Sequence, residues 1–367
     1  MLETKAQRSR SPDMSQILAT APASRAAIDP LPLRTDAGLL GVYQLKRAWA
    51  RHRASQQGRP NAFDRREFHL DHLVFDALGI GLEQTMQYLS RQMPAFAEFE
   101  HWIIATTGGV PELQVARINA AISRTTYPPE ISRWLADVAA SETVLSADDL
   151  AFWDEHGYVV LHDAVPAETR TAATQAVLDD VGARLDDPQT WYRHNDHGIM
   201  VQHFQHPAFD ANRKAPRIHK AFAQLWGTAD LWVSTDRVGF NPPERPGWRF
   251  PGPDLHWDVS LHQPMPLGMS GILYLTDTEA EQGAFTLVPG FHRRVGDWLA
   301  SLPAGADPRR QDLHALGSKP IAGRAGDLVI WHDALPHGSR PNRARMPRIV
   351  QYIRMYPTDQ EFADVWV

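Results

Sequence analysis

Six short apolar segments follow one another from residue 229 onward, and no regular alternation of strand and helix separates them. They cover residues 230–240, 255–262, 271–277, 284–290, 327–333 and 348–357. Each is rich in Val, Ile, Leu, Tyr or Trp, and loops with Pro or Gly lie between them, which is typical of β-strands. Since parallel strands need a crossover helix and antiparallel strands need only a turn, the pattern predicts an antiparallel sandwich or jelly roll.

The hundred residues before this region have a helical pattern. Between about 38 and 142, apolar residues recur at spacings of three and four, as at Leu82, Met86, Leu89 and Met93. This is the period of an amphipathic helix, and Gly or Pro separates the segments. The sequence therefore predicts an all-helical module of four to six helices.

The chain is predicted to have three regions. Residues 1–36 have no periodicity and are expected to form a mobile arm, 37–143 the helical module and 144–367 the β core. Within the core, helices are expected at 146–157, with Ser146 as N-cap, and at 167–185. The connection at 139–149 lacks the Gly, Pro and Ser run of a flexible linker, so the module is expected to pack on the core. The predicted class is α+β with a mainly β core.

Composition excludes several kinds of protein. The chain has no Cys, which rules out disulfide frameworks and thiolate metal sites, so any metal must be held by His, Asp or Glu. The formal net charge of −6 argues against binding to nucleic acid or to anionic lipid. No stretch approaches the ~20 apolar residues of a membrane span, and the first residues lack an apolar leader. We expect a soluble, cytoplasmic protein.

A His-x-Asp pair lies in the second predicted strand. Alternation would place His256 and Asp258 on one face and Trp257 on the other. His337 follows a later strand and could supply a third ligand. Two His and one carboxylate leave three coordination positions open on Fe(II). The alternative is that these are ordinary surface or core side chains, since the chain has 17 His.

An arginine begins the last predicted strand. Arg348, Val350 and Tyr352 share one face of it, so an inward Arg348 would lie inside the roll. A buried guanidinium needs an anionic partner, and a dicarboxylate co-substrate would provide one.

Six motifs occur in a characteristic order: DDLAFWDEHGYVVL, GFNPP, LHWD, EQGAFTLVPGFH, AGDLVIWHDALPHGS and PRIVQYIRMYP. Over roughly 145–356, the chain resembles the phytanoyl-CoA dioxygenase (PhyH-like) family of Fe(II)/2-oxoglutarate-dependent oxygenases. The resemblance implies a double-stranded β-helix of the cupin-like kind. The helical module is outside the resemblance.

The resemblance also implies roles for individual residues. The implied iron ligands are His256, Asp258 and His337. The implied 2-oxoglutarate contacts are Arg348, for the distal carboxylate, Ser339 and Asn241. Related halogenases have a small residue at the position of Asp258, so its presence favours hydroxylation.

Four residues are candidates for substrate contact. Trp248 and Arg249 lie in the loop 240–254 just before the first implied ligand, where a lid is a common arrangement. His262 follows the His-x-Asp pair, and Tyr352 shares the face of Arg348. The loop could equally be a Pro-stiffened surface connection. A further cluster, His194, His197, His203 and His206, is interpreted as pocket-lining or surface groups.

The predicted function is Fe(II)/2-oxoglutarate-dependent hydroxylation of an unactivated C–H bond in a small natural-product-like or amino-acid-like molecule. The cofactors would be Fe(II), 2-oxoglutarate and O2, and the products succinate and CO2. Desaturation or cyclisation would use the same site. A binding or scaffold protein without turnover, or a metal-dependent isomerase or hydrolase, could be built on the same roll. The expected partner is a small molecule, with no nucleic acid or membrane, and a carrier protein could present it. No sequence feature assigns an oligomeric state.

Overall fold

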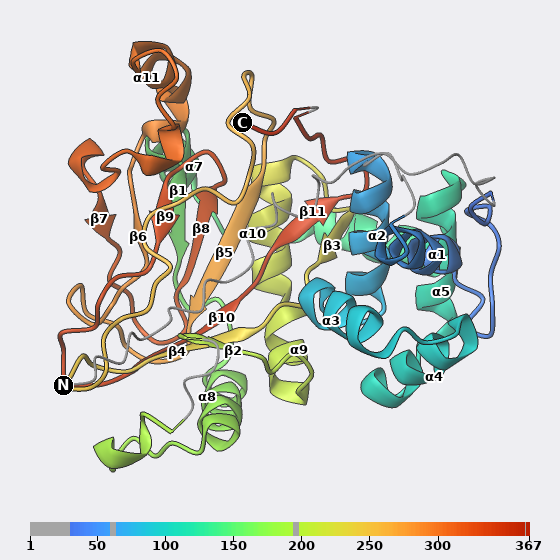
Figure 1. The fold of residues 1–367 in the computed structure, drawn as a ribbon, viewed down its shortest axis with the longest axis horizontal. Coiled ribbons are helices and arrows are strands. Elements are labelled where there is room, and N and C mark those ends of the chain that lie inside the picture. The colour runs from blue at the N-terminus through green and yellow to red at the C-terminus, as the bar shows by residue number, and fades with distance from the viewer. Residues whose placement is uncertain (1–29, 59–63, 194–197, 364) are drawn as a thin grey trace, which may run out of the picture. The chain divides into compact units, whose positions relative to one another are not determined.

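The strands after residue 157 form antiparallel pairs. In this computed structural model, which describes residues 30–58, 64–193, 198–363 and 365–367, the largest sheet has the order β1-β8-β5-β10-β4-β2 (Figure 1). The bounds are β1 Tyr158–Leu161, β2 Met200–Val201, β4 Val238–Asn241, β5 Met269–Tyr274, β8 Leu328–His332 and β10 Arg348–Tyr352. All five neighbouring pairs are antiparallel.

A smaller sheet faces the large one. Its order is β7-β6-β9, with β6 at Thr286–Leu287, β7 at Lys319–Pro320 and β9 at His337–Gly338. One buried cluster joins Leu287 of the small sheet to Ile272, Val329 and Val350 of the large sheet. Two antiparallel sheets packed across an apolar core form a double-stranded β-helix, called the roll below, as the sequence predicted.

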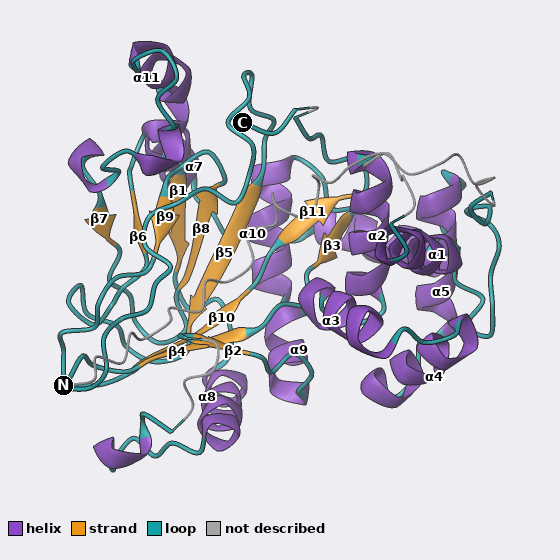
Figure 2. Ribbon diagram, viewed as in Figure 1, coloured by secondary structure: helices purple, strands orange, loops and turns teal. Residues whose placement is uncertain are grey.

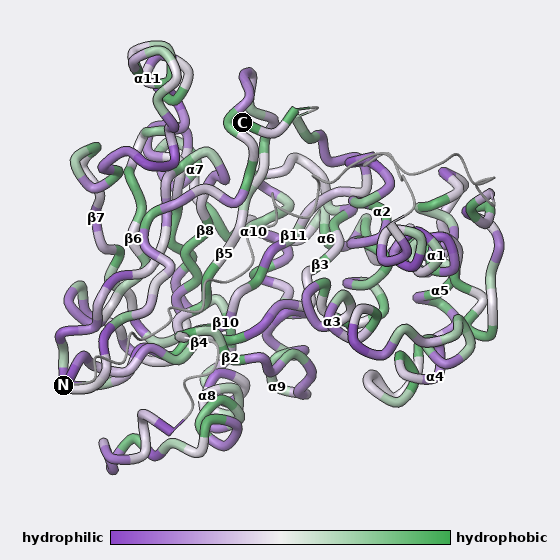
Figure 3. Tube along the Cα trace, viewed as in Figure 1, coloured by the Kyte–Doolittle hydropathy of each residue, from purple (hydrophilic) through white to green (hydrophobic). Residues whose placement is uncertain are grey.

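Helices cover the outer face of the large sheet. They are α8 Ala167–Val181, α9 Pro207–Arg213 and α10 Pro216–Trp226. Ile349 and Ile353 belong to the buried cluster on this helical side, whereas Val350 belongs to the cluster inside the roll. This confirms the predicted register of β10. Both faces of the sheet are buried, and Figure 3 shows β8 as hydrophobic along much of its length.

The predicted helical segments before residue 142 all form helices. They are α1 Leu45–Gln56, α2 Arg65–Ala77, α3 Leu82–Gln92, α4 Phe96–Thr107, α5 Glu112–Ser123 and α6 Pro129–Ala140, and α1 to α5 gather at one side of the sheets in Figure 2. Helices α1 to α5 share a core that includes Trp232 and Tyr356, which belong to a separate two-stranded sheet of β3 Leu231–Val233 and β11 Met355–Pro357. Helix α6 packs against α10. Residues Pro32–Val367 form one compact unit. The domain boundary at 143 stays a prediction, and the predicted arm 1–36 lies outside the described residues except for 30–36.

The predicted N-cap begins α7, Ala147–His156. The Ser146 hydroxyl accepts the Asp149 backbone N–H at 3.1 Å, and the Asp149 carboxylate accepts the Ser146 backbone N–H at 2.8 Å. This capping box satisfies two donors at the helix start. The remaining helix is α11, Val295–Ser301, and short 3-10 turns lie at Pro188–Thr190, Phe291–Arg293, Pro308–Arg310 and His314–Leu316.

The predicted strand at 255–262 is wrong. Only His256 pairs there, in a single antiparallel bridge with His337. The Arg309 guanidinium donates to the carbonyls of Trp257 and Val259 at 2.8 and 2.6 Å. These two carbonyls therefore accept hydrogen bonds from a side chain, whereas in a sheet they would accept them from a neighbouring strand.

Candidate metal centre

The two histidines of the predicted triad are held together by the backbone. The N–H of His256 donates to the carbonyl of His337 at 2.9 Å, and the N–H of His337 donates to that of His256 at 3.0 Å. His337 also pairs with Leu287 of β6. The two imidazole ring centres are consequently 5.0 Å apart.

The Asp258 carboxylate lies between the two imidazoles. Its Oδ1 is 3.3 Å from His256 Nε2, and its Oδ2 is 3.2 Å from His337 Nε2. The intervening Trp257 is buried and donates its indole N–H to the Ala334 carbonyl at 2.9 Å, so it points away from the carboxylate. The three potential ligand atoms lie within 4.8 Å of one another, and no second such group of His, Asp and Glu occurs among the described residues.

Backbone carbonyls orient both rings. The Nδ1 atom of His256 is 2.7 Å from the Asp254 carbonyl, and that of His337 is 3.0 Å from the Leu335 carbonyl. Because a carbonyl can only accept, each Nδ1 carries a hydrogen and each Nε2 of a neutral ring keeps its lone pair. Two lone pairs and a carboxylate then meet at one point, which suits a cation.

The electrostatics of the triad agree with this geometry. Desolvation raises the pKa of the Asp258 carboxyl, but hydrogen bonds with His256 and His337 lower it more, so the pKa lies well below its usual value. Desolvation lowers the pKa of His256, and the contacts with Asp258 outweigh it and raise the pKa. Both directions agree with an ionised carboxylate between the two imidazoles.

Arg348 is a fully buried cation on β10. Its Nη2 donates to Ser339 Oγ at 3.0 Å, and its Nε and Nη1 have no partner in the part of the chain that the structure describes. Asn241 faces it on β4, where the Oδ1 atom is also buried without a partner. An unsatisfied buried polar group costs about 1–3 kcal/mol, and more if charged. A carboxylate would satisfy the free donors of Arg348, so the residues present fit 2-oxoglutarate.

A cavity of about 440 Å³ contains the triad. Ser339, Tyr352, Phe285 and Trp331 line it beside the triad. Its other walls are formed by α2, α3, the segment 234–237 and Arg354. Sites for small molecules commonly measure about 300–1,000 Å³, so the cavity suits a small ligand.

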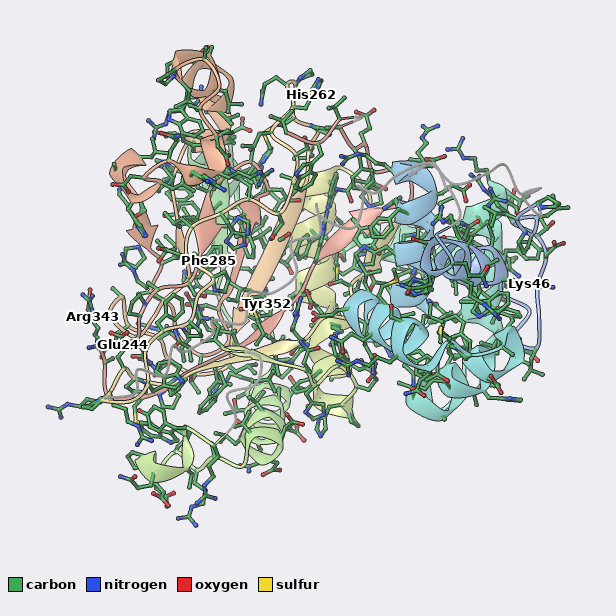
Figure 4. The ribbon with its side chains drawn as sticks, in the orientation of Figure 1. Lys46, Glu244, His262, Phe285, Arg343 and Tyr352 are labelled. Atoms are coloured by element: carbon green, nitrogen blue, oxygen red, sulfur yellow. The ribbon has the colours of Figure 1, made fainter. Side chains whose placement is uncertain are left out.

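The predicted substrate residues do not all lie near the triad. Tyr352 lines the cavity, whereas Trp248, Arg249 and His262 do not. Trp248 is buried beside the Tyr192 ring, and the Arg249 side chain is 82% exposed. Figure 4 shows Tyr352 within the roll and His262 apart from it at one end.

Several cavity residues were missed in the sequence. They are His72 and Asp76 of α2, Glu83 of α3, Asp236, Arg237 and Arg354. Arg354 continues the alternation of Arg348 and Tyr352, so its position could have been predicted. No sequence signal indicates which face of α2 meets the roll.

The second histidine cluster does not form a site in the described residues. The Nδ1 atom of His203 lies 3.5 Å from the Asp180 Oδ1 atom. The Nδ1 atom of His206 accepts the Ala208 N–H at the start of α9. His194 and His197 lie outside the described residues. The two described histidines therefore have local structural contacts and do not line the cavity of the triad.

The comparison with protein families agrees with the site. The model of the family "Phytanoyl-CoA dioxygenase (PhyH)" matches residues 153–350, which include the triad, Ser339 and Arg348. The chain belongs to the phytanoyl-CoA dioxygenase family. As a member, it is an Fe(II)/2-oxoglutarate-dependent oxygenase, with iron, 2-oxoglutarate and O2 as its cofactor and co-substrates.

Three proteins similar to this phytanoyl-CoA dioxygenase family member share less than a quarter of their aligned residues with it. A putative phytanoyl-CoA dioxygenase from Dictyostelium discoideum is 23% identical over 260 residues, covering 56% of this chain and 74% of the relative. An ectoine dioxygenase from Bordetella parapertussis is 24% identical over 235 residues, covering 56% and 73%. The structure of EctD from S. alaskensis with bound Fe is 21% identical, with a TM-score of 0.44, covering 61% of this chain and 81% of that one. Among the described residues, no helix is long and apolar enough to cross a bilayer.

Proposed function

We propose that this protein hydroxylates an unactivated C–H bond of a small molecule, forming succinate and CO2 from 2-oxoglutarate. In this proposal His256, Asp258 and His337 hold Fe(II). Arg348 and Ser339 bind the distal carboxylate of 2-oxoglutarate, and Asn241 lies beside it.

One observation carries the proposal. Three metal-ligand side chains converge in a cavity, and a buried arginine with unsatisfied donors lies nearby. A metal-dependent isomerase or hydrolase would have no use for the arginine, whereas a dicarboxylate co-substrate requires it. Neither group would be needed in a scaffold protein.

The residues around the triad have separate tasks. Iron, 2-oxoglutarate and O2 together supply the oxidant that breaks the C–H bond. The carbonyls of Asp254 and Leu335 fix the imidazole orientation. The rings of Trp331 and Phe285 lie 5.0 and 5.9 Å from the His337 ring and exclude water from that side. Tyr352 lines the cavity and is the predicted substrate contact.

The substrate class is the finer part of the proposal. The cavity size supports a small molecule, and its polar walls support one with hydrogen-bonding groups. Ectoine dioxygenases among the relatives support a natural-product-like or amino-acid-like compound. Desaturation or cyclisation would use the same residues with another substrate placement.

Succinate formation tests the enzyme class without a known substrate. Purified protein with Fe(II), 2-oxoglutarate and O2 should release succinate slowly, and His256→Ala should abolish this. His101→Ala, at an exposed position of α4, is the matched control. No succinate from wild-type protein would contradict the proposal. A metabolite screen then identifies the reaction, because hydroxylation adds one oxygen atom and desaturation removes two hydrogen atoms.

A further inference from the structure

Arg354 lies two residues beyond the end of β10, on the side of the strand that Arg348 and Tyr352 share. It lines the same cavity as the triad. Six residues of extended chain span up to roughly 20 Å, so the two arginines lie far apart along the strand direction. Arg348 lies at the end of the site where 2-oxoglutarate is proposed to bind, and Arg354 lies at the other end.

One hydrogen-bond donor of Arg354, the Nε atom, has no acceptor among the described residues. Its Nη2 donates to Gln360 Oε1 at 3.3 Å, and its Nε is buried without a partner. The Asp333 carboxylate is 3.5 Å from Nη2 but makes no hydrogen bond to it. The side chain is 27% exposed. The guanidinium therefore has a charge neighbour and one unsatisfied donor, and the side chain lines the cavity with part of its surface exposed.

The other acidic groups of this wall are already engaged. The Asp76 carboxylate accepts hydrogen bonds from the Thr235 N–H and the Tyr356 hydroxyl. Both Glu83 and Asp236 pair with Arg237. None of them is left to occupy the unsatisfied donor of Arg354.

We infer that Arg354 binds a carboxylate group of the substrate. The substrates are then small carboxylic acids, oxidised at a carbon that reaches the triad while the carboxylate is held at Arg354. The helices α2 and α3, which the family match does not include, close this end of the cavity through His72 and Glu83. The inference rests on the proposed function and names the substrate class of that site.

Matched pairs of compounds test the inference. A panel of small carboxylic acids, amino acids included, is compared with the corresponding primary amides, which keep the shape and lose the charge. The readout is the concentration that half-maximally stimulates succinate formation above the substrate-free rate. For wild-type protein, acids should stimulate at concentrations at least about tenfold lower than their amides, as expected for loss of a charge pair.

Variants locate the effect. Arg354→Gln should raise the half-maximal concentration of the acid at least about tenfold and remove the preference for acid over amide. Arg354→Lys, which keeps a positive charge, should keep part of this preference. The half-maximal concentration of 2-oxoglutarate should rise much less, which separates this subsite from that of Arg348. Arg133→Gln, at an exposed position of α6, is the control.

Each outcome separates the two proposals. If wild-type protein forms no succinate without substrate, the proposed function fails. If succinate forms without substrate, the proposed function stands, and three results would contradict only the inference about Arg354. These are that no acid in the panel stimulates succinate formation, that amides stimulate it at the same concentrations as acids, or that Arg354→Gln keeps the preference for acids. Melting temperatures show whether each variant is folded, and the acid–amide comparison in wild-type protein does not depend on any variant.

Discussion

Arg348 and Asn241 face each other across β10 and β4, and two donor atoms of Arg348 and the Oδ1 of Asn241 are buried without a partner in the described structure. Residues directly opposite each other in an antiparallel pair are close in space, so the Arg348 guanidinium and the Asn241 amide are neighbours. The strand pairing thus creates a buried polar site, and Ser339, which accepts a hydrogen bond from Arg348, lines the cavity that contains the triad. The pairing is fixed by backbone hydrogen bonds and by Ile349 and Val350 on either face.

Removing this cation should weaken 2-oxoglutarate binding. Replacement of Arg348 by Ala leaves a carboxylate without its partner in a buried site, a loss of about 2–5 kcal/mol. We expect the apparent KM for 2-oxoglutarate to rise by at least one order of magnitude, and more than that of the prime substrate. Arg345→Ala, three residues earlier and exposed, should leave it unchanged. An unaltered KM in Arg348→Ala would assign the role to another arginine.

Loss of one ligand should abolish iron binding and turnover. Asp258→Ala leaves two imidazoles, which cannot hold the metal in the geometry of a facial triad. Iron content after dialysis and succinate formation measure the two effects. Asp137→Ala, on the exposed face of α6, controls for the loss of a carboxylate. Near wild-type activity of Asp258→Ala would refute the ligand assignment.

Asp76 should make stability fall as pH rises. Burial raises the pKa of its carboxyl from 3.8 to about 7, although hydrogen bonds with Tyr356 and Thr235 oppose this. Between these pH values the folded state binds more protons than the unfolded state, so the free energy of unfolding decreases with pH. The full shift corresponds to a loss on the order of 4 kcal/mol.

The variant Asp76→Asn isolates this contribution. Burial lowers the pKa of both His69 and His72 to about 4, which acts in the opposite direction, because an unfolded histidine gains its proton at higher pH than the folded one. Urea unfolding at several pH values compares the two proteins. The difference in unfolding free energy, wild type minus variant, should fall from about pH 4 to pH 7. A constant difference would contradict the prediction.

The helical module should be required for a stable roll. Trp232 is buried in the core of the helices, and the Arg117 guanidinium lies 3.9 Å from the centre of its ring. Deletion of residues 1–142 would expose this ring and Tyr356, so we expect insoluble or strongly destabilised protein. A soluble fragment with substrate-free succinate formation would show instead that the module is only tethered.

A point substitution tests the same contact in the full chain. Trp232→Ala should lower the free energy of unfolding by about 3–5 kcal/mol, the usual cost of truncating a buried aromatic side chain. Leu113→Ala, at an exposed position of α5, should change it little. Denaturant unfolding measures both variants.

The sequence by itself determined the features that depend on local pattern. Periods of three to four residues identified the helices, Ser146 identified a helix start, and alternation placed Val350 inside the roll and Ile349 outside. These features follow from backbone geometry within one element, which the chain carries in its own residue order. The triad was indicated by the order of motifs shared with the family, since the strand expected at 255–262 does not form and His337 comes from β9.

Only the tertiary structure decided which distant side chains share the cavity. Arg309 takes the carbonyls at 257 and 259, so the expected strand there is a bridge followed by a loop. His72 reaches the cavity because α2 packs against Trp232 and Tyr356, a contact between segments more than 150 residues apart. Such packing depends on the combined shape of several elements, and no periodicity within a single segment records it.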